Sequence, residues 1–262
     1  MTIVSDSNAF EVLDVHQHIP LEMGEFERDR SARLAFMDKF GIDQACVSPP
    51  VMPPHTVSTG ELNQRVCAYS EARPDRFPYA FGTIDTRGGD AELYQLESFA
   101  RLRLRGVTWH HAFQGTFLDH PSMDPVLTFC ASHQLLAIVH LIVGSLLESP
   151  WRLARLCERH QSVTFVALDG LSSPHHAEWT IEMASHLPNL YVDTGVLSSF
   201  GNPVEKFVDR IGPDRLLLGT DLDTLPKSFN FPYPLFEVAH SSLAAQDKCK
   251  ILADNTRRLL TA

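Results

Sequence analysis

Two histidines that are two residues apart stand early in the chain. His16 and His18 end an apolar stretch that begins near Phe10, in the run Asp-Val-His-Gln-His at 14–18. Residues two apart in a β-strand point to the same side, so this spacing would put two imidazoles on one face at a strand's end. Two such rings can share one cation, and the run therefore predicts half of a metal site. Two surface or hydrogen-bonded histidines explain the same spacing, so the prediction depends on the rest of the sequence.

The composition is that of a globular protein with a large core. The chain has 262 residues, of which 44% are hydrophobic and 9% aromatic, enough for one α/β barrel or two smaller domains. We see no linker, charge block or repeat, and expect one domain over residues 1–262. The net charge is −10 and no basic run could neutralise a phosphate backbone, which argues against a nucleic-acid partner.

Neither the start of the chain nor its cysteines suggest export or a membrane. The first eight residues lack a basic segment followed by an apolar core, and no later run approaches ~18 uninterrupted apolar residues. We therefore expect a cytoplasmic protein without a membrane partner. The five cysteines are odd in number, scattered and without a Cys-x-x-Cys pair, so we expect them to be reduced and mostly buried.

Short β-rich runs alternate with longer helical patterns along the chain. The predicted strands are residues 11–16, 44–48, 79–84, 106–110, 136–140, 163–168, 190–193 and 215–219. The predicted helices are residues 31–40, 61–72, 91–102, 125–133, 151–160, 178–186, 204–211 and about 246–260. Eight parallel strands joined by helices can close without an edge, so we predict an α/β fold of the (β/α)8 TIM-barrel type. A doubly wound sheet would carry a glycine-rich turn where the first strand here ends in His-Gln-His-Ile-Pro.

Polar side chains gather at the predicted carboxyl ends of the strands, where barrel enzymes carry their catalytic groups. Taken singly, each is most simply a histidine bonded to a backbone carbonyl or an aspartate that caps a helix. Their coincidence at one end of one barrel favours a functional site. They are His16, His18, His110, His111, His140, Asp169, Asp193, Thr220 and Asp221.

Several of these segments together resemble the amidohydrolase superfamily. They are Asp-x-His-x-His at 14–18, Leu-Leu-Ala-Ile-Val-His at 135–140, Asn-Leu-Tyr-Val-Asp-Thr at 189–194, Arg-Leu-Leu-Leu-Gly-Thr-Asp at 215–221 and Ile-Leu-Ala-Asp-Asn-Thr-Arg-Arg-Leu-Leu at 251–260. The chain is most similar to the amidohydrolase 2 branch, which includes relatives of aminocarboxymuconate-semialdehyde decarboxylase. The resemblance covers about residues 11 to 260.

The resemblance implies a distorted (β/α)8 barrel with a divalent metal, usually zinc, at its mouth. Carried over by position, His16 and His18 are first-strand ligands, His140 is the fifth-strand ligand, and Asp221 contacts both metal and water. Imidazoles and one carboxylate suit zinc and leave an open position for water, whose pKa the metal can lower to ~7. Asp221 could then take the proton of that water and deliver it to the leaving group.

The fourth strand indicates one metal rather than two. Two-metal members of the superfamily typically bridge their ions with a carboxylated lysine there, and this chain has no lysine between Lys39 and Lys206. We expect one divalent ion, most simply zinc, with manganese as the alternative. Thr108 takes the place of the lysine, and His110 would face the mouth, where it could polarise a substrate carbonyl or help hold the metal. A histidine wedged in the barrel interior is the other interpretation.

The sixth strand departs from the family pattern. Relatives usually have a histidine that orients the attacking water, and Asp169 stands in its place. Asp169 could be a second carboxylate base or a metal ligand, or could only brace the barrel, as we expect of Asp193. His175 and His176, beside Pro174, are expected in an exposed turn.

The loops indicate the kind of substrate. Residues 49–55 and 225–234 are rich in proline, methionine and aromatics, which build stiff apolar walls or simply pack the loops together. Phe113 and Phe117 could extend those walls, and Arg87 is the candidate anchor for a substrate carboxylate. We expect a small, partly apolar substrate.

Three functions follow from the sequence. The first is a mononuclear metal hydrolase that opens an amide, lactone or ester with metal-bound hydroxide. The second is a non-oxidative decarboxylase of an aromatic or muconate-like acid, although such relatives usually are longer and retain the strand-six histidine. The third is a non-enzymatic binding barrel, against which four converging polar groups argue. A homo-oligomer is compatible with all three.

Overall fold

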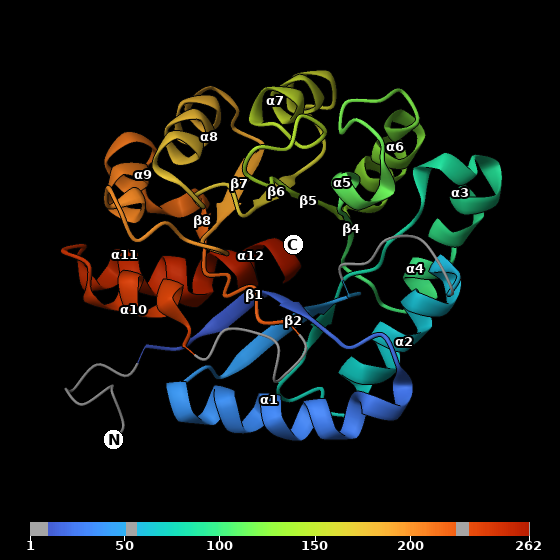
Figure 1. The fold of residues 1–262 in the computed structure, drawn as a ribbon, viewed down its shortest axis with the longest axis horizontal. Helices are drawn as coiled ribbons and strands as arrows, with labels where there is room; N and C mark the ends of the chain where they lie inside the picture. Colours follow the sequence, from blue (N-terminus) through green and yellow to red (C-terminus); the bar gives the residue numbers. More distant parts are fainter. Residues whose placement is uncertain (1–9, 51–56, 224–230, 262) are drawn as a thin grey trace.

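Parallel strands and helices alternate throughout the computed structural model, which describes residues 10–50, 57–223 and 231–261. The helices surround the strands (Figure 1). All pairs of neighbouring strands are parallel. The strands are β1 (Leu13–His18), β2 (Gln44–Ser48), β3 (Tyr79–Ala80), β4 (Gly106–Trp109), β5 (Leu136–His140), β6 (Phe165–Leu168), β7 (Leu190–Asp193) and β8 (Leu216–Leu217).

Backbone hydrogen bonds join the strands into a barrel. Strands β1 to β3 form one sheet and β4 to β8 another. The amide of Gly82, just after β3, donates to the carbonyl of Gly106 in β4 at 3.0 Å. On the other side, the amide of Val15 in β1 donates to the carbonyl of Leu218, just after β8, at 2.9 Å. The TIM-barrel prediction is confirmed.

The helices follow the predicted order with some changes of boundary. The longer ones are α1 (Phe26–Phe40), α2 (Thr59–Glu71), α6 (Met123–His133), α7 (Pro150–Arg159), α8 (Pro174–His186), α9 (Pro203–Ile211) and α10 (Tyr233–His240). The shorter ones are α3 (Asp90–Leu96), α4 (Ser98–Arg101), α5 (His111–Gln114), α11 (Ala245–Cys249) and α12 (Asn255–Thr261). Short 3₁₀ turns are η1 (Met23–Glu25), η2 (Thr86–Gly88) and η3 (Pro213–Arg215), and η4 (Lys250–Asp254) is π-helical.

Two single helices of the prediction are divided in the structure. The pattern at 91–102 becomes α3 and α4, and the last pattern becomes α11, η4 and α12. The last division has a physical reason. The amide of Leu218 donates to the carbonyl of Ile251 at 2.9 Å, so a carbonyl of η4 bonds the barrel. No helix in the described ranges has both the length and the apolar character needed to cross a membrane.

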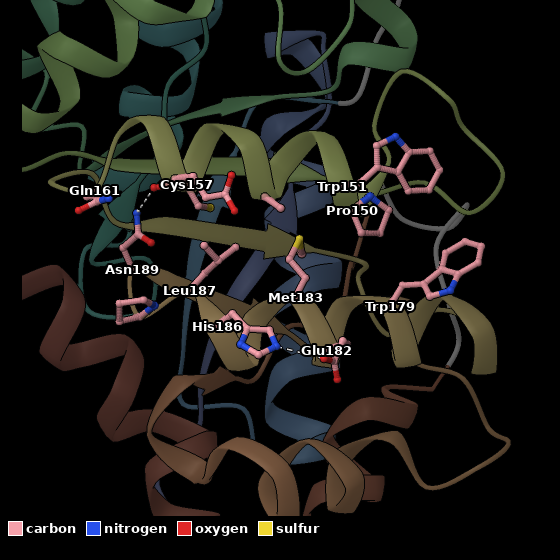
Figure 2. A pocket seen from close by; sticks show the side chains of 13 residues that line it. Pro150, Trp151, Cys157, Gln161, Trp179, Glu182, Met183, His186, Leu187 and Asn189 are labelled. Atoms are coloured by element: carbon pink, nitrogen blue, oxygen red, sulfur yellow. Dashed lines mark hydrogen bonds and ion pairs between the residues drawn. The ribbon is translucent and has the colours of Figure 1, made fainter.

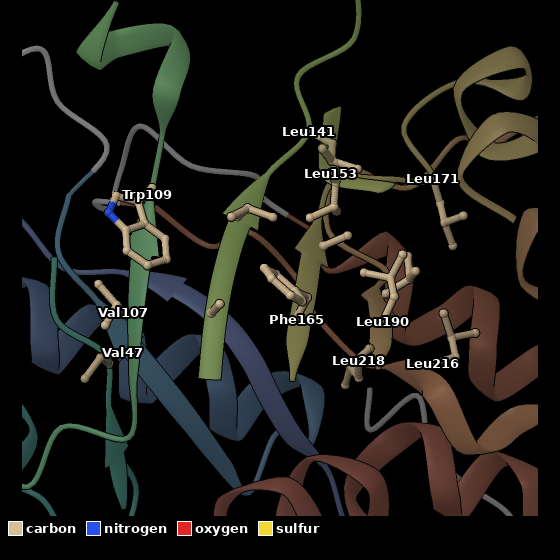
Figure 3. Close-up of a cluster of buried hydrophobic side chains, with 14 of the residues drawn as sticks. Val47, Val107, Trp109, Leu141, Leu153, Phe165, Leu171, Leu190, Leu216 and Leu218 are labelled. Atoms are coloured by element: carbon tan, nitrogen blue, oxygen red, sulfur yellow. The ribbon is translucent and has the colours of Figure 1, made fainter. Parts of the chain in front are cut away.

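The apolar core has two parts. The larger part lies between the strands and the helices around them, and includes Val47, Val107 and Phe165 (Figure 3). The smaller part fills the barrel interior and extends to Leu260 of the last helix. All five cysteines are free, and four of them are buried, as the sequence predicts.

Alternation along β5 directs His140 to the mouth of the barrel. Leu136 and Ile138 belong to the interior cluster, whereas Ala137 and Val139 belong to the outer one. His140 is in phase with Ile138, so its side chain points inward where the strand ends.

An irregularity in β1 does the same for the first two histidines. Leu13 and Val15 face the interior, and strict alternation would leave His16 and His18 on the outer side. The register of β1 against β2 shifts between Asp14 and Gln17. Such a shift re-aims the following side chains, which brings both histidines to the mouth.

The prediction for the histidines after β6 is wrong for His176. We expected an exposed turn, but Pro174 begins α8 and the hydroxyl of Ser173 accepts the amide of His176 at 3.2 Å. His176 is buried. A proline at the first position of a helix is a helix-start signal, and it accounts for the difference.

A fully buried arginine on α1 ties the helix to the seam between β1 and β8. Arg33 bonds the carboxylate of Asp29 at 3.1 Å and the hydroxyl of Tyr69 at 3.2 Å. It also donates to the carbonyls of His18 at 2.8 Å and Leu222 at 3.1 Å. These bonds fix the backbone at His18 and at Leu222, next to Asp221.

Replacing Arg33 by methionine should destabilise the fold by about 3–5 kcal/mol, because it breaks a buried ion pair and removes donors to two buried carbonyls. Chemical denaturation followed by circular dichroism measures this change. Arg73→Met removes an arginine paired with Asp75 at the surface, at 2.7 Å, and should cost no more than about 1 kcal/mol. Equal losses in the two variants would contradict the role given to Arg33.

Candidate metal centre

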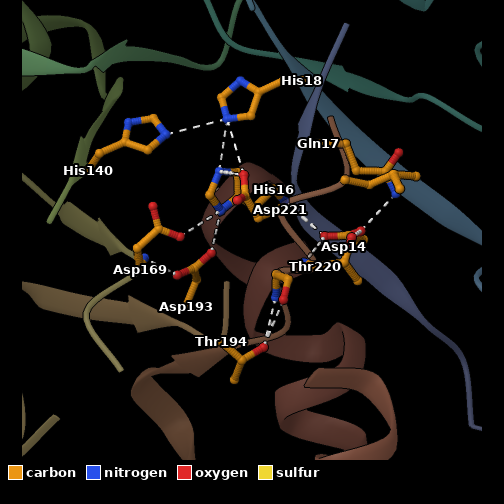
Figure 4. Close-up of polar contacts among 12 residues, drawn as sticks. Asp14, His16, Gln17, His18, His140, Asp169, Asp193, Thr194, Thr220 and Asp221 are labelled. Atoms are coloured by element: carbon orange, nitrogen blue, oxygen red, sulfur yellow. Dashed lines mark hydrogen bonds and ion pairs between the residues drawn. The ribbon is translucent and has the colours of Figure 1, made fainter. Parts of the chain in front are cut away.

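Three histidine side chains meet at the mouth of the barrel (Figure 4). Nε2 of His18 lies 3.0 Å from Nε2 of His16 and 3.4 Å from Nε2 of His140. All three side chains are buried. The structure therefore brings together the three histidines that the sequence predicts as ligands, and they form a group that could hold a metal ion.

The other nitrogen of each ring is bound to an acceptor. Nδ1 of His16 donates to Asp193 Oδ2 at 2.8 Å, that of His18 to the carbonyl of Pro49 at 2.7 Å, and that of His140 to the carbonyl of Trp109 at 2.8 Å. These acceptors put a proton on Nδ1, and Nε2 is then the nitrogen that can bind a cation. Metal-binding histidines are normally held in this way.

Asp221 completes the group from the loop after β8. Its Oδ1 lies 3.2 Å from Nε2 of His16 and 3.7 Å from Nε2 of His18. Zinc ligands at ~2.0–2.1 Å in a tetrahedron are about 3.3 Å from one another, close to these separations. The donor set therefore fits one divalent ion. The backbone of Asp221 has a φ of 53°, which aspartate tolerates better than most residues.

A second carboxylate layer lies behind His16. Asp193 binds that ring and also accepts the amide of Asp169 at 2.9 Å, so it links β7, β1 and the end of β6. Oδ1 of Asp169 lies 3.8 Å from Nδ1 of His16. Gly195 permits this crowding, because a Cβ there would lie 2.7 Å from Nδ1 of His16 and 2.8 Å from each carboxylate.

Charge and burial separate the protonation states of the histidines. Burial lowers the pKa of His16, but the charges of Asp221 and Asp193 outweigh burial and raise it well above the ordinary value. Burial and the nearby His16 lower the pKa of His18 to about 4. Burial, reinforced by His110, also holds the pKa of His140 well below its usual range. Without a cation, the raised pKa favours a second proton on His16, and this proton on Nε2 points into the centre.

Charge and burial also separate the pKa values of Asp221 and Asp169. Burial raises the pKa of Asp221, but the neighbouring His16 and His18 outweigh it and leave that pKa below the ordinary value. Burial raises the pKa of Asp169 well above its usual range, and the charges of Asp221 and Asp193 add to burial. Asp221 is therefore ionised at neutral pH, whereas Asp169 holds its proton more tightly.

His110 lies beside the centre rather than in it. Its ring stacks on that of His140 with centroids 4.6 Å apart and an angle of 15°. Phe113 meets its ring edge-on at 4.3 Å, and the side chain of Phe113 is exposed at the mouth. His111 is buried against Met123 of α6 and points away from the mouth.

Two other predicted features are Arg87 and the loops expected to wall the substrate. Arg87 is paired with its neighbour Asp85 at 2.6 Å, which neutralises its charge. Of the loops predicted at 49–55 and 225–234, residues 51–55 and 225–230 lie outside the described residues.

Sequence reasoning missed one acidic residue at the mouth. Glu148, in the loop between β5 and α7, is fully buried, and its Oε1 lies 2.8 Å from Nδ1 of His110. A single glutamate before Ser-Pro is typical of an exposed helix start, so the sequence does not indicate that Glu148 is buried at the mouth. Asp14 was part of the first motif but had no role; it accepts from the amide of Thr220 at 3.0 Å and so braces β1 against β8.

A groove of about 840 Å³ lies elsewhere, between α7 and α8 on the outer wall of the barrel (Figure 2). Trp151 and Trp179 stand at one end of it, with ring centroids 6.0 Å apart. None of the predicted site residues lines the groove, so the candidate site is the metal centre at the mouth.

Solved structures share this fold along almost the whole chain. 5-Carboxyvanillate decarboxylase from Sphingomonas paucimobilis is 13% identical with a TM-score of 0.73, and the match covers 96% of this chain and 99% of that chain. An uncharacterised TIM-barrel protein from Bordetella bronchiseptica is 20% identical with a TM-score of 0.73, over 96% and 98%. A variant of 5-carboxyvanillate decarboxylase from Novosphingobium aromaticivorans, with bound manganese and a nitrobenzoic acid, is 15% identical with a TM-score of 0.73, over 97% of both chains.

A family comparison decides the relationship. No curated protein matches the chain. The model of the Amidohydrolase family, however, matches residues 13–261, which include every residue of the metal centre. The chain belongs to the amidohydrolase family, in the amidohydrolase 2 branch that its sequence resembles.

Proposed function

We propose that the chain is a metal-dependent hydrolase that cleaves an amide, lactone or ester bond of a small, partly apolar substrate. One observation supports this most directly: three histidine nitrogens and Asp221 converge at ligand separations, and the Asp221 side chain keeps 22% exposure. A single group can thus contact both the ion and a substrate. Membership of an enzyme family that acts on small molecules agrees with the proposal.

The protein groups divide the proton transfers between two carboxylates. His16, His18, His140 and Asp221 would hold one divalent ion, which would supply Lewis acidity toward water. Asp221, ionised at neutral pH, takes the proton of the attacking water. Asp169, whose pKa burial raises, is the group suited to hold a proton for the leaving atom. Two carboxyls with pKa values pushed in opposite directions are typical of a base and an acid.

The charge around the centre favours a neutral substrate. The ion pairs that the site histidines make in the described ranges go to Asp169, Asp193, Asp221 and Glu148. A carboxylate substrate would meet the ionised Asp221 among these groups, and Arg87 is already paired with Asp85. The prediction that Arg87 anchors a carboxylate stays a prediction. His110 and Phe113 are proposed to contact the substrate, His110 at its polar part and Phe113 along its apolar part.

Decarboxylation is the second candidate. The similar structures that are 5-carboxyvanillate decarboxylases, one of them with manganese, support it through the shared fold. In that reaction the ion would hold the acid and a protein group would protonate carbon. The strand-six histidine that such decarboxylases usually retain is replaced by Asp169, which argues against this candidate. Asp169 instead supplies the second carboxyl group that the proposed hydrolysis uses. Zinc is the proposed metal and manganese the alternative; a cytoplasmic location and a homo-oligomer stay predictions.

His140→Ala should remove the metal, because it deletes one of three imidazole ligands. Plasma mass spectrometry should find about one equivalent of zinc or manganese in the parent protein. The loss in affinity should exceed the ~10–100-fold that removal of an orienting partner costs. His133→Ala, which changes an exposed histidine of α6, serves as the control and should keep its metal. Full metal content in His140→Ala would show that the ligand set is wrong.

Metal affinity should rise with pH, by up to about tenfold per unit for one displaced proton. The direction of this pH dependence follows from His16, whose raised pKa keeps its ring protonated in the metal-free protein at neutral pH. The cation must displace that proton, and lower pH favours the proton. Zinc titrations at several pH values, corrected for buffer binding, measure the slope. A slope of zero would mean that His16 is neutral before metal binds.

Substrate screening tests the function. The zinc- and manganese-loaded protein should release product from one or more neutral lactones, amides or esters, and Asp221→Asn should lower the rate by about 10²–10⁴-fold. Aromatic acids are screened in parallel for carbon dioxide release. Carbon dioxide without hydrolysis would replace the proposal by the decarboxylase. Metal binding with neither activity over the panel would favour the binding barrel.

A further inference from the structure

Glu148 is a buried carboxylate in the loop between β5 and α7. It is fully buried, and its Oε1 accepts the amide of Ala112, in the first turn of α5, at 2.9 Å. The same oxygen lies 2.8 Å from Nδ1 of His110, at ion-pair distance although not aligned for a full hydrogen bond. Its Oε2 has no hydrogen-bond partner among the described residues.

His110 is held between a metal ligand and the substrate side. One face of its ring is parallel to His140 at 4.6 Å, and Phe113 packs edge-on at 4.3 Å. The His110 side chain keeps 10% exposure, so the ring is buried except at the mouth. These contacts leave the side-chain torsions of His110 free to turn the ring in its own plane, and the contact to Glu148 fixes that orientation.

Burial of a carboxylate needs a strong partner. A neutral acceptor such as glutamine or serine would satisfy the Ala112 amide without the cost of burying a charge. A carboxylate there gains most from an imidazole N–H, the donor that His110 offers. The choice of glutamate therefore points to His110 and not to the backbone amide alone.

We infer that Glu148 is a positioning residue for His110: it keeps the proton on Nδ1 and leaves Nε2 as the nitrogen that meets the substrate. The effect on turnover rests on the proposed function, whereas the position of the proton does not. Glu148 would thus act on His110 as the Nδ1 acceptors act on the three ligand histidines, through an ion-pair contact in place of an aligned hydrogen bond.

Proton–nitrogen correlation NMR of protein with isotope-labelled histidines tests the inference without a substrate. His110→Asn identifies the signals of His110 by their loss. In the parent protein, both metal-free and zinc-loaded, a proton on Nδ1 is expected, whether or not Nε2 also carries one. A proton on Nε2 alone would overturn the inference, and this result does not depend on any variant being folded.

Variants then separate positioning from simple support of the loop. Glu148→Gln keeps an acceptor oxygen and should keep the Nδ1 proton, whereas Glu148→Leu should move it to Nε2 in part or completely. Glu182→Gln, on the exposed face of α8, is the control for a lost carboxylate and should change nothing. A folded Glu148→Leu protein with an unchanged His110 tautomer would contradict the inference.

Turnover gives an independent measure once a substrate is found. Glu148→Leu should lower kcat by up to about 100-fold with metal content unchanged, as expected for a misplaced catalytic group. In the His110→Asn background the same change should cost little, because two residues that act as a unit are not additive. Equal losses in both backgrounds would assign Glu148 a role unrelated to His110. Absence of any hydrolysis would remove the proposed function and leave the NMR result intact.

Discussion

Three imidazole nitrogens that face one another are the constraint on which the site depends. Nε2 of His18 lies 3.0 Å from Nε2 of His16 and 3.4 Å from Nε2 of His140. Each Nδ1 is hydrogen-bonded to an acceptor. Neutral rings in this arrangement direct lone pairs at one point, which is unfavourable unless a proton or a metal ion lies there. The shift in β1, the inward phase of β5 and the glycine beside Asp193 all serve to bring these rings together.

Much of the fold could be predicted because it depends on periodicity and on parallel closure. The order of eight strands and the ends that carry His16, His140 and Asp221 follow from local patterns. Strand boundaries were less predictable, because they depend on the partner strand. The predicted strand at 79–84 has only two residues in the structure, Tyr79–Ala80, since the bonds of Gly82 cross to β4. The four predicted ligand residues do lie together, as the family resemblance suggested, although the shift in β1 that brings His16 and His18 to the mouth was not predicted.

The features that could not be predicted are those set by contacts between distant segments. Glu148 meets His110 across 38 positions of sequence, and Arg33 meets the carbonyl of Leu222 across 189. Neither residue belongs to a motif, and both look like surface charges from their neighbours in sequence. Burial of a charge is decided by tertiary packing, so a single sequence carries little information about it.

The position of Asp193 has a consequence for the barrel as a whole. One carboxylate connects β7 to a ring of β1 and to the backbone after β6, so the same bonds that orient a ligand also hold distant strands together. The unfolded chain has no such preformed cluster. Whatever cation binds the folded centre therefore adds its own binding free energy to the stability of the barrel, in proportion to the logarithm of its concentration. Under the proposed function, metal supply in the surroundings would then set the fraction of folded protein as well as the activity.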